Sequence, residues 1–136
     1  MIAFIDTNVI IDVLSKRPGY ETSAPILEMC EAGNITGYAT TSTITDIVYI
    51  LSQYLDKKTA KQKTAELLEI LELAVVEKAD IQKALDHEMA DFEDAVLALC
   101  AKRHKADMII TRNIKDFKLS PVDAVEPDDK KLLSTQ

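Results

Sequence analysis

Glycine and proline are scarce in this sequence, with three and four residues respectively among 136. Gly19, Gly33 and Gly37 fit neither the GxGxxG pattern nor a Walker A loop, so the chain lacks the usual glycine-rich cradle for a nucleotide cofactor. So little glycine and proline also argues against disorder and low-complexity repeats. We therefore expect a folded chain with few and short loops and no bound nucleotide cofactor.

Cysteines and long apolar runs are lacking as well. Cys30 and Cys100 lie far apart in the sequence, each among apolar or helical neighbours, so we interpret them as small buried side chains and not as a disulfide or a catalytic thiol. No charged amino-terminal segment leads into a long apolar run, and no apolar stretch approaches the roughly 20 residues that cross a bilayer. We expect a cytoplasmic protein with no membrane segment.

Basic side chains are outnumbered, 16 against 23 acidic ones, which gives a formal net charge of −7. This balance argues against a protein that binds nucleic acid through its overall electrostatic field. The length and the hydrophobic share of 47% are those of one globular domain, residues 1–136. A core of that size needs no disulfide or structural metal.

Short β-rich runs alternate with longer stretches of helical period. This order predicts parallel strands joined by right-handed helical crossovers, and hence an α/β fold, a three-layer α/β/α sandwich with a parallel five-stranded sheet. In such sheets, ligands bind beyond the carboxyl ends of the strands. The predicted strands are Ile2 to Asp6, Ile35 to Thr40, Leu73 to Glu77, Met108 to Thr111 and Val122 to Val125. The predicted helices are approximately Asn8 to Leu14, Glu21 to Ala32, Ile44 to Leu55, Thr59 to Leu71, Ile81 to Leu85 and Phe92 to His104.

The first predicted strand ends in three polar residues, Asp6, Thr7 and Asn8, before the chain turns helical. Asp6 or Asn8 can cap the helix that follows, but three polar groups in succession are more than one cap needs. Asp6 is therefore a candidate functional carboxylate at the end of a central strand. A phosphatase of the DxD type would need a second carboxylate at position 8, where this sequence has asparagine.

The second predicted strand runs into the hydroxyl-rich stretch TTSTITD. Thr43 and Asp46 match a capping box, which would make Asp46 a structural acid at the positive end of a helix. Asp46 nevertheless lies at the same strand-to-helix edge as Asp6. That edge is where a second carboxylate of a site would have to be.

Three acids, Asp91, Glu93 and Asp94, stand at the head of a helix whose next seven residues are apolar. Asp91 can cap this helix, with Asp94 closing a capping box. At 100° per residue, Asp94 shares its side of the helix with Leu97 and Ala98, so it heads a buried face. A carboxylate there needs a partner or a cation, which makes Asp94 a candidate metal ligand beside Asp91.

The fourth predicted strand ends in the polar turn TRNIKD. Thr111 and Asn113 can be turn residues, and Asp116 can be a solvated acid. Together the four segments deliver Asp, Thr and Asn side chains, and no histidine or cysteine, to one edge of the sheet. Hard oxygen ligands favour Mg²⁺ or Mn²⁺ over zinc, and such ions support hydrolysis of phosphodiester bonds by an activated water.

Four segments, FIDTNVIID, TSTITDIVYIL, DFEDAVLALCA and IITRNIKDF, resemble a PIN domain in this order and spacing, over nearly the whole chain. The last two are similar to the branch that includes prokaryotic VapC-like toxins. The resemblance implies a Mg²⁺- or Mn²⁺-dependent endoribonuclease with an RNA substrate, acting as the toxin of a toxin–antitoxin pair. It also implies a homodimer and a cognate antitoxin protein as an inhibitory partner.

Carried over by position, the resemblance makes Asp6 and Asp94 metal ligands. Asp46 stands where the family usually has glutamate, so the resemblance implies that Asp46 reaches the metal through a water molecule. The fourth acidic position of many family members falls at Asn113, which is neutral, and Asp116 is a candidate replacement. The neutral residue puts the binding of a second metal ion in question. The polar positions that in the family orient the acids or the scissile phosphate are matched by Thr7, Asn8 and Thr111.

Two other functions stay open at this point. The short Asp46 side chain and the neutral Asn113 also fit a catalytically weakened PIN-like fold that binds RNA or serves in an assembly. A magnesium-dependent phosphatase acting on small phosphate esters is a further alternative, which Asn8 disfavours. Substrate contacts of a nuclease could come from three basic groups, namely Lys57, Lys58, Lys61 and Lys63; Arg112, Lys115 and Lys118; and Lys102, Arg103 and Lys105.

Overall fold

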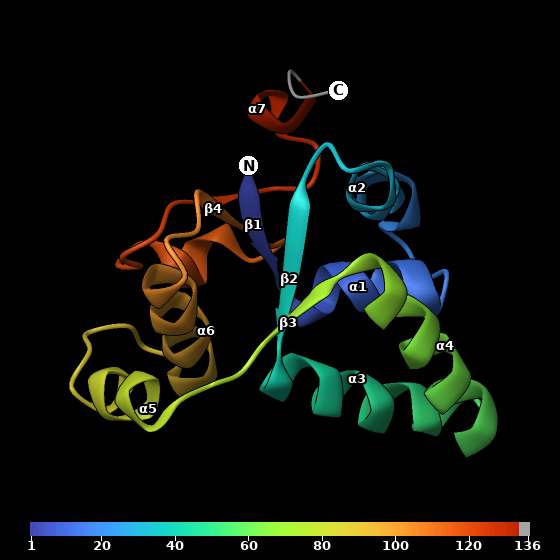
Figure 1. The fold of residues 1–136 in the computed structure, drawn as a ribbon, viewed down its shortest axis with the longest axis horizontal. Helices are drawn as coiled ribbons and strands as arrows, with labels where there is room; N and C mark the ends of the chain where they lie inside the picture. Colours follow the sequence, from blue (N-terminus) through green and yellow to red (C-terminus); the bar gives the residue numbers. More distant parts are fainter. Residues whose placement is uncertain (134–136) are drawn as a thin grey trace.

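A parallel five-stranded sheet forms the centre of the computed structural model, which describes residues 1–133 (Figure 1). Its strands lie in the order β3-β2-β1-β4-β5, so the predicted fold class is confirmed. In the central strand, Phe4 pairs in register with Tyr38 on β2 and Ile109 on β4. Residues 134–136, which the predicted domain includes, lie outside the described residues. The strands are β1 (Ile2–Ile5), β2 (Thr36–Thr40), β3 (Glu72–Ala74), β4 (Met108–Ile110) and β5 (Ala124–Val125).

Helices occupy most of the chain between the strands, and every predicted helix is present. The sequence pattern does not predict the short elements η1 and α7, because each is about one turn long and shows no repeat of apolar positions. The helices are α1 (Thr7–Leu14), α2 (Tyr20–Ala32), α3 (Thr41–Tyr54), α4 (Lys57–Ile70), α5 (Lys78–Leu85), α6 (Phe92–Arg103), the 3₁₀ helix η1 (Ile114–Phe117) and α7 (Lys130–Leu133).

Local capping sets helix starts that the apolar periodicity places too late. Asp56 caps α4, where its Oδ1 accepts from the Thr59 backbone nitrogen at 2.8 Å. Glu77 and Asp80 close a capping box at the start of α5. The prediction of a strand from 73 to 77 is therefore wrong at its carboxyl end, because β3 stops at Ala74 and Glu77 already belongs to the helix cap.

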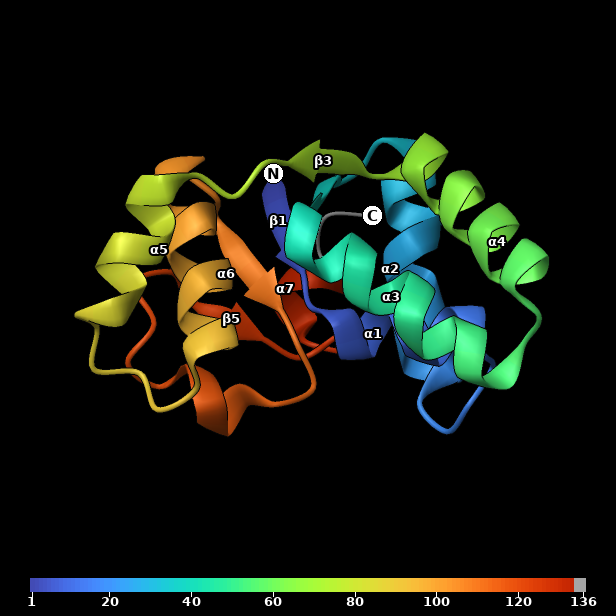
Figure 2. The same ribbon diagram turned by 90° about the horizontal axis from the view of Figure 1, so that it is seen from below.

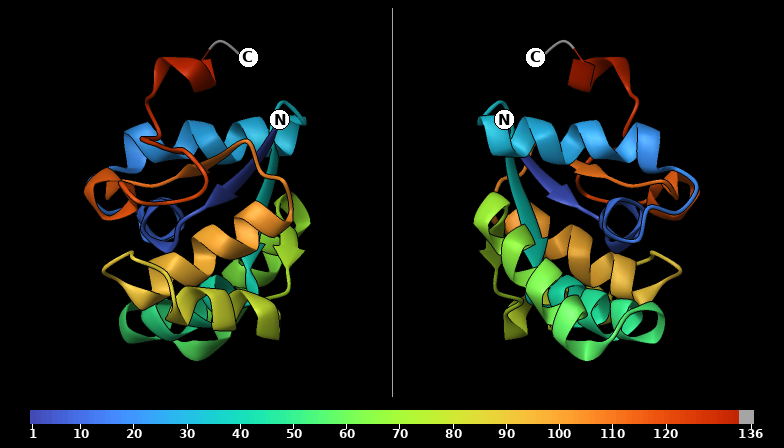
Figure 3. Two further views of the ribbon diagram at one scale, coloured as in Figure 1. Left: turned by 90° about the vertical axis from the view of Figure 1, so that its left-hand side faces the viewer. Right: turned by 90° about the vertical axis from the view of Figure 1, so that its right-hand side faces the viewer.

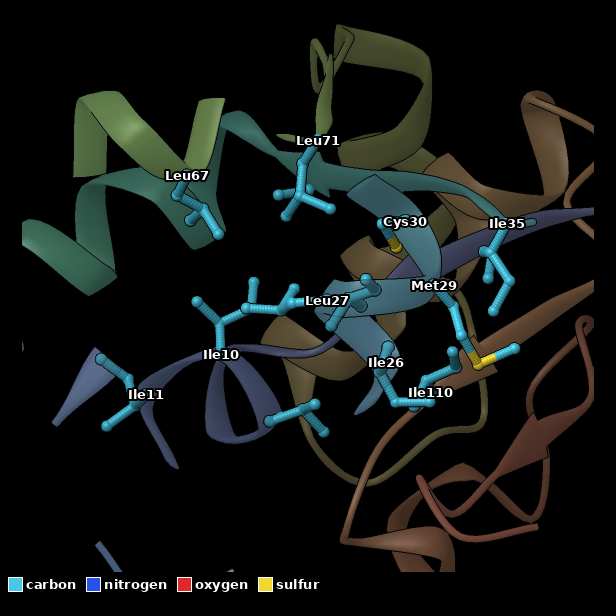
Figure 4. Close-up of a cluster of buried hydrophobic side chains, with 14 of the residues drawn as sticks. Ile10, Ile11, Ile26, Leu27, Met29, Cys30, Ile35, Leu67, Leu71 and Ile110 are labelled. Carbon is cyan, nitrogen blue, oxygen red and sulfur yellow. The ribbon is translucent and has the colours of Figure 1, made fainter. Parts of the chain in front are cut away.

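The side chains of the central strands alternate between two hydrophobic cores. Ala3 and Ile5 pack against α1, α2, α3 and α4 on one face of the sheet, whereas Phe4 and Ile109 pack against α5 and α6 on the other. Figure 2 shows α5 and α6 on one side and α1 to α4 on the other. In the first core, Figure 4 shows apolar side chains of α1, α2 and α4 gathered beside the sheet. These two layers and the sheet are the predicted sandwich.

The short helix α7 lies at the end of the molecule that also holds the amino terminus, away from α3 and α4 (Figure 3). Its Leu132 is fully buried in the first core. No helix within residues 1–133 combines the length and the apolar character that a membrane crossing requires.

Gly37 on β2 allows α2 to approach the sheet closely. A Cβ atom at this position would lie 2.6 Å from Cys30 Sγ, 2.8 Å from Leu71 Cδ2 and 3.1 Å from Ile5 Cδ1. All three neighbours are buried in the first core. A close-packed interior has no free space in which to move them aside.

We expect Gly37→Val to lower the free energy of unfolding by about 1–3 kcal/mol, because the added side chain overpacks the contact between α2 and the sheet. Urea unfolding followed by circular dichroism measures this change. Thr36→Val, at an exposed position of the same strand, is the control and should stay within about 0.5 kcal/mol of the original protein. Equal stability of the two variants would contradict the packing described here.

Candidate active site

Asp6 stands where the central strand β1 gives way to α1. Its backbone nitrogen donates to the carbonyl oxygen of Ile110 on β4 at 2.9 Å. Its carboxylate caps α1, with Oδ1 accepting from the Thr7 nitrogen at 2.8 Å, while Oδ2 accepts from the Thr111 hydroxyl at 2.8 Å. The predicted place at the end of a central strand is confirmed, and the same carboxylate is also the helix cap. The strand order changes direction between β1 and β4, which is where open α/β sheets bind ligands.

Asn8, Thr111 and Asn113 form a hydrogen-bonded frame around Asp6. The Asn8 amide nitrogen donates to Asp6 Oδ2 at 3.3 Å, and its amide oxygen accepts from the Arg112 backbone nitrogen at 3.4 Å. The Asn113 backbone nitrogen donates to the Thr111 hydroxyl at 3.0 Å. The frame therefore joins the loop after β4 to the end of β1 and fixes the direction of the Asp6 carboxylate.

Asp46 lies on α3, but it does not cap that helix. The predicted capping box of Thr43 and Asp46 is wrong, because α3 begins three residues earlier and Thr40 is its cap. The Thr40 hydroxyl accepts from the Thr43 backbone nitrogen at 3.1 Å. Within residues 1–133 the Asp46 carboxylate forms no hydrogen bond or ion pair with a protein group, so it is free to receive a ligand.

Asp91 and Asp94 take different roles at the start of α6. Asp91 is exposed and caps the helix, with Oδ1 accepting from the Asp94 backbone nitrogen at 3.0 Å. Asp94 is half-buried and continues into the buried face that carries Leu97 and Ala98. The structure thus gives Asp91 the capping role and directs Asp94 toward the site.

A cavity of about 320 Å³ opens at this edge of the sheet. The helices α1, α3 and α6 all contribute their first turns to it, and Figure 2 looks onto this edge. Helix amino termini carry partial positive charge, which offsets part of the repulsion among the acids. Sequence reasoning places Glu93 in the acidic cluster but gives Phe92 no role, because nothing in its spacing sets Phe92 apart from a solvated helix start. The cavity is lined by Asp6, Thr7, Thr40, Ser42, Thr43, Thr45, Asp46, Ile81, Phe92, Glu93, Asp94, Val96 and Leu97.

The acids of the site raise the pKa values of one another. Burial raises the pKa of Asp94 to about 7, with the charges of Asp6, Asp91, Asp116 and Glu93 adding to the effect. Burial likewise raises the pKa of Asp6, although the hydrogen bonds from Thr111 and Thr7 act in the opposite direction. The charge of Asp46 is the main cause that raises the pKa of Glu93. Asp116 on η1, which is exposed, thus acts on the site through its charge. The cluster has an excess of negative charge with no basic side chain in its lining.

The donor chemistry of this cavity suits a hard divalent cation. Among the described residues no group of three or more His, Cys, Asp or Glu side chains is placed to hold a metal ion. Mg²⁺ commonly uses only one or two carboxylates and completes its shell with water and substrate oxygens. Asp6 and Asp94 provide two carboxylates of that kind, and neither is neutralised by a basic partner.

Comparison with known proteins agrees with this geometry. The sequence profile of the PIN domain matches residues 3–115. The chain belongs to the PIN domain family. Ribonuclease VapC1 of Aquifex aeolicus (strain VF5) is 30% identical to this PIN domain over 120 residues, which are 84% of this chain and 82% of that protein.

Two solved structures show the same fold. A toxin–antitoxin complex from Klebsiella pneumoniae contains a chain that is 27% identical to this PIN domain, with a TM-score of 0.70 over 92% of this chain and 97% of that chain. VapBC2 from Rickettsia felis, bound to a DNA fragment from its promoter, gives a TM-score of 0.72 at 20% identity over 93% of this chain and 98% of that chain. The fold therefore extends over nearly the whole of this PIN domain.

Among the described residues, none of the three basic groups contributes a side chain to the lining of the cavity. Lys102 lies in the last turn of α6, and Lys105 comes just after this helix. Because a helix rises about 1.5 Å per residue, both lysines are far from the acidic residues at its start. The lysines of α4 come after the carboxyl end of α3, whereas the amino-terminal part of α3 lines the cavity. Of the third group, the Arg112 side chain is turned away to the buried Asp12, with its Nε 2.6 Å from Asp12 Oδ2.

The surroundings of the histidines and cysteines indicate structural roles for these residues. His87 lies in a loop, where its Nδ1 accepts from the Met89 backbone nitrogen at 3.2 Å. The His104 ring packs against Phe4, with their centroids 5.4 Å apart. Burial raises the pKa of Cys30 to about 12 and that of Cys100 to about 11, so both thiols stay protonated at neutral pH and are unsuited to nucleophilic attack.

Asp94→Asn should stabilise the metal-free PIN domain at neutral and alkaline pH. The pKa of Asp94 is about 7 in the folded chain and roughly 3.9 in the unfolded one, so the folded state holds more protons between these values and loses stability as pH rises. The increase in the free energy of unfolding that the substitution causes should be small at pH 4, grow up to about pH 7 and then level off. Urea unfolding in EDTA across this pH range measures it.

Asp123→Asn is the matched control, because Asp123 is exposed and immediately precedes β5 at the opposite edge of the sheet. Its effect on stability should not follow the same pH dependence. A pH-independent effect of Asp94→Asn would show that the half-buried carboxylate is not under electrostatic stress.

Proposed function

We propose that this PIN domain is a metal-dependent endoribonuclease that hydrolyses phosphodiester bonds of RNA. The observation that carries the proposal is the pair of carboxylates, Asp6 and Asp94, in one cavity at the carboxyl edge of the sheet with no basic partner. The name of the 30%-identical relative, Ribonuclease VapC1, supports the substrate class. The surplus of negative charge supports a divalent cation as the missing partner.

Asp6 and Asp94 would hold Mg²⁺ or Mn²⁺, and Asp46 would contact it through a water molecule. Such an ion supplies counter-charge to the phosphate and activates the attacking water. Asp46 is short for direct ligation, but its carboxylate has no partner among residues 1–133 and lines the same cavity. Asp91 caps α6 through one carboxylate oxygen, so we place it outside the ligand set.

The remaining site residues orient these acids. Thr111 donates to Asp6, and Asn113 in turn donates to Thr111, so the loop after β4 sets the direction in which Asp6 points. Asn8 joins the same frame. Within residues 1–133 the Thr7 hydroxyl forms no capping hydrogen bond. Thr7 lines the cavity beside Asp6, where its hydroxyl can contact the scissile phosphate. Asp116 contributes negative potential and takes the role that an acid at position 113 would have.

We further propose that the protein is the toxin of a toxin–antitoxin pair in the cytoplasm and forms a homodimer. The 27%-identical chain from Klebsiella pneumoniae belongs to a toxin–antitoxin complex, which supports a cognate antitoxin as the protein partner. Two buried, unpaired cysteines are consistent with a reducing compartment. Exposed Tyr49 and Tyr54 on α3 offer apolar surface for a second copy.

A catalytically weakened RNA-binding module is the second candidate. It is favoured by one observation, the short Asp46 side chain, which lines the cavity and has no partner within the described part of the chain. A phosphatase of the DxD type gains no support, because Asn8 is engaged with Asp6 and Arg112.

RNA hydrolysis should require Mg²⁺ or Mn²⁺ and should fall more than about 100-fold in Asp94→Asn, because the substitution removes a ligand and not merely an outer contact. Cleavage of a labelled RNA with metal, with EDTA and after metal is restored measures both effects. The melting temperature should rise with Mg²⁺ in the original protein and not in Asp94→Asn. Asp123→Asn should cleave normally. Metal-independent RNA binding without cleavage, unchanged in Asp94→Asn, would favour the binding module.

Asp46→Glu should increase the apparent affinity for Mg²⁺, because the added methylene brings the carboxylate toward direct contact with the ion. The measurement is the Mg²⁺ concentration that gives half-maximal RNA cleavage, which should decrease. The companion variant is Glu93→Gln, because the negative charge of Asp46 raises the pKa of Glu93. An unchanged Mg²⁺ requirement in Asp46→Glu would show that Asp46 does not contact the ion, even through a water molecule.

A further inference from the structure

We propose that Phe92 is a stacking platform for the base of an unpaired nucleotide next to the scissile phosphate. The proposal rests on the ribonuclease function proposed above and deepens it, because it names the residue that would hold a base of the substrate. Two observations carry it, the exposure of Phe92 and its place in the lining of the cavity that holds Asp6 and Asp94.

Phe92 is the first residue of α6 and directly follows the cap Asp91. Its exposed fraction is 45%, although the other two phenylalanines of the chain are buried. Asp94 lies two residues further along the same helix. Side chains two residues apart on a helix do not face each other, but Phe92 and Asp94 both line this cavity, so a nucleotide bound in it can contact the ring and the carboxylate.

The neighbours of Phe92 make one part of the cavity apolar. Val96 lies one turn further on α6, and Ile81 comes from α5, which packs against α6. From α3, Ser42 and Thr45 bring hydroxyl groups to the same cavity. A flat aromatic face with polar groups nearby suits a nucleobase, which has an apolar face and hydrogen-bonding edges.

The size of the cavity limits the ligand. Its volume of about 320 Å³ is at the lower end of small-molecule pockets, which hold roughly 300–1,000 Å³. One nucleotide fits such a volume, whereas a paired base would first have to leave its stack. Unpaired RNA avoids that unfavourable step.

The distribution of basic residues adds a reason for stacking. Lys102 and Lys105 lie near the far end of α6, and Arg112 is paired with the buried Asp12. Among the described residues, no lysine or arginine lines the cavity. Base stacking does not depend on positive charge and supplies affinity where lysines and arginines do not.

The chain contains no tryptophan, so Phe92→Trp would carry a single fluorescent indole at the proposed platform. In Ca²⁺, titration with a short oligoadenylate should quench its emission to saturation, and an abasic oligomer of equal length should not. Leu73→Trp is the control, because Leu73 has the same exposed fraction of 45% and lies outside the cavity lining. Equal quenching by both oligomers, or none by oligoadenylate, would overturn the proposal.

Cleavage kinetics separate this proposal from the ribonuclease proposal. Phe92→Ala should raise KM for single-stranded RNA by about 5- to 150-fold, the range measured for loss of one stacked base, with kcat changed far less. Phe92→Tyr should restore the original KM, and Leu73→Ala should leave it unchanged. Absence of any cleavage by the original protein would refute the ribonuclease function. Normal cleavage with an unchanged KM in Phe92→Ala would refute only the stacking platform.

Discussion

Negative charge concentrated at the carboxyl edge of the sheet is the constraint on which the rest of the site depends. Burial and the charge of Asp6 together raise the pKa of Asp94 to about 7, so an ionised pair is unfavourable without a counter-charge. Three helices begin at this edge and offer partial positive charge, but no basic side chain lines the cavity. The fold holds the acids together against their repulsion, which is the condition in which a divalent cation binds most favourably.

The frame that holds the acids is tied down by a second, buried carboxylate. Asp12 is fully buried and pairs with Arg17 at 2.8 Å and with Arg112 at 2.6 Å. Because Arg112 follows Thr111 directly, this pairing anchors the loop that orients Asp6. Gly19 permits the arrangement, since it has a φ of +103° and a Cβ there would lie 2.8 Å from Asp12 Oδ2. Asp12 is therefore neutralised by arginine, whereas the acids that line the cavity have no basic partner among the described residues.

Sequence patterns predict the sheet, its helices and the two main carboxylates, because these depend on local periodicity and on residues at strand ends. Asp6 is marked by the abrupt change from an apolar strand to polar residues, and Asp94 by its place at the head of an apolar helix face. The partnership of Asp6 with Thr111 joins residues 105 positions apart, and no local pattern reports a contact of that separation. The cap of α3 was misplaced because Thr40 and Thr43 are both good caps and only the backbone path decides between them. Phe92 and Asp12 carry no sequence signal for the same reason, since their roles arise from neighbours on other elements.

The net charge of −7 takes a different meaning once the acids have positions. Six of the 23 acidic residues belong to the cluster, namely Asp6, Asp46, Asp91, Glu93, Asp94 and Asp116, and the other 17 nearly balance the 16 basic ones. Bound cations invert the local field, so a phosphate can approach a site that repels it in their absence. Arg112 and Arg103 are held by Asp12 and Asp80, and no basic side chain of the described residues lines the cavity. Under the proposed function, recognition of RNA would depend on the metal and on the base, and only weakly on contacts to the remaining phosphates.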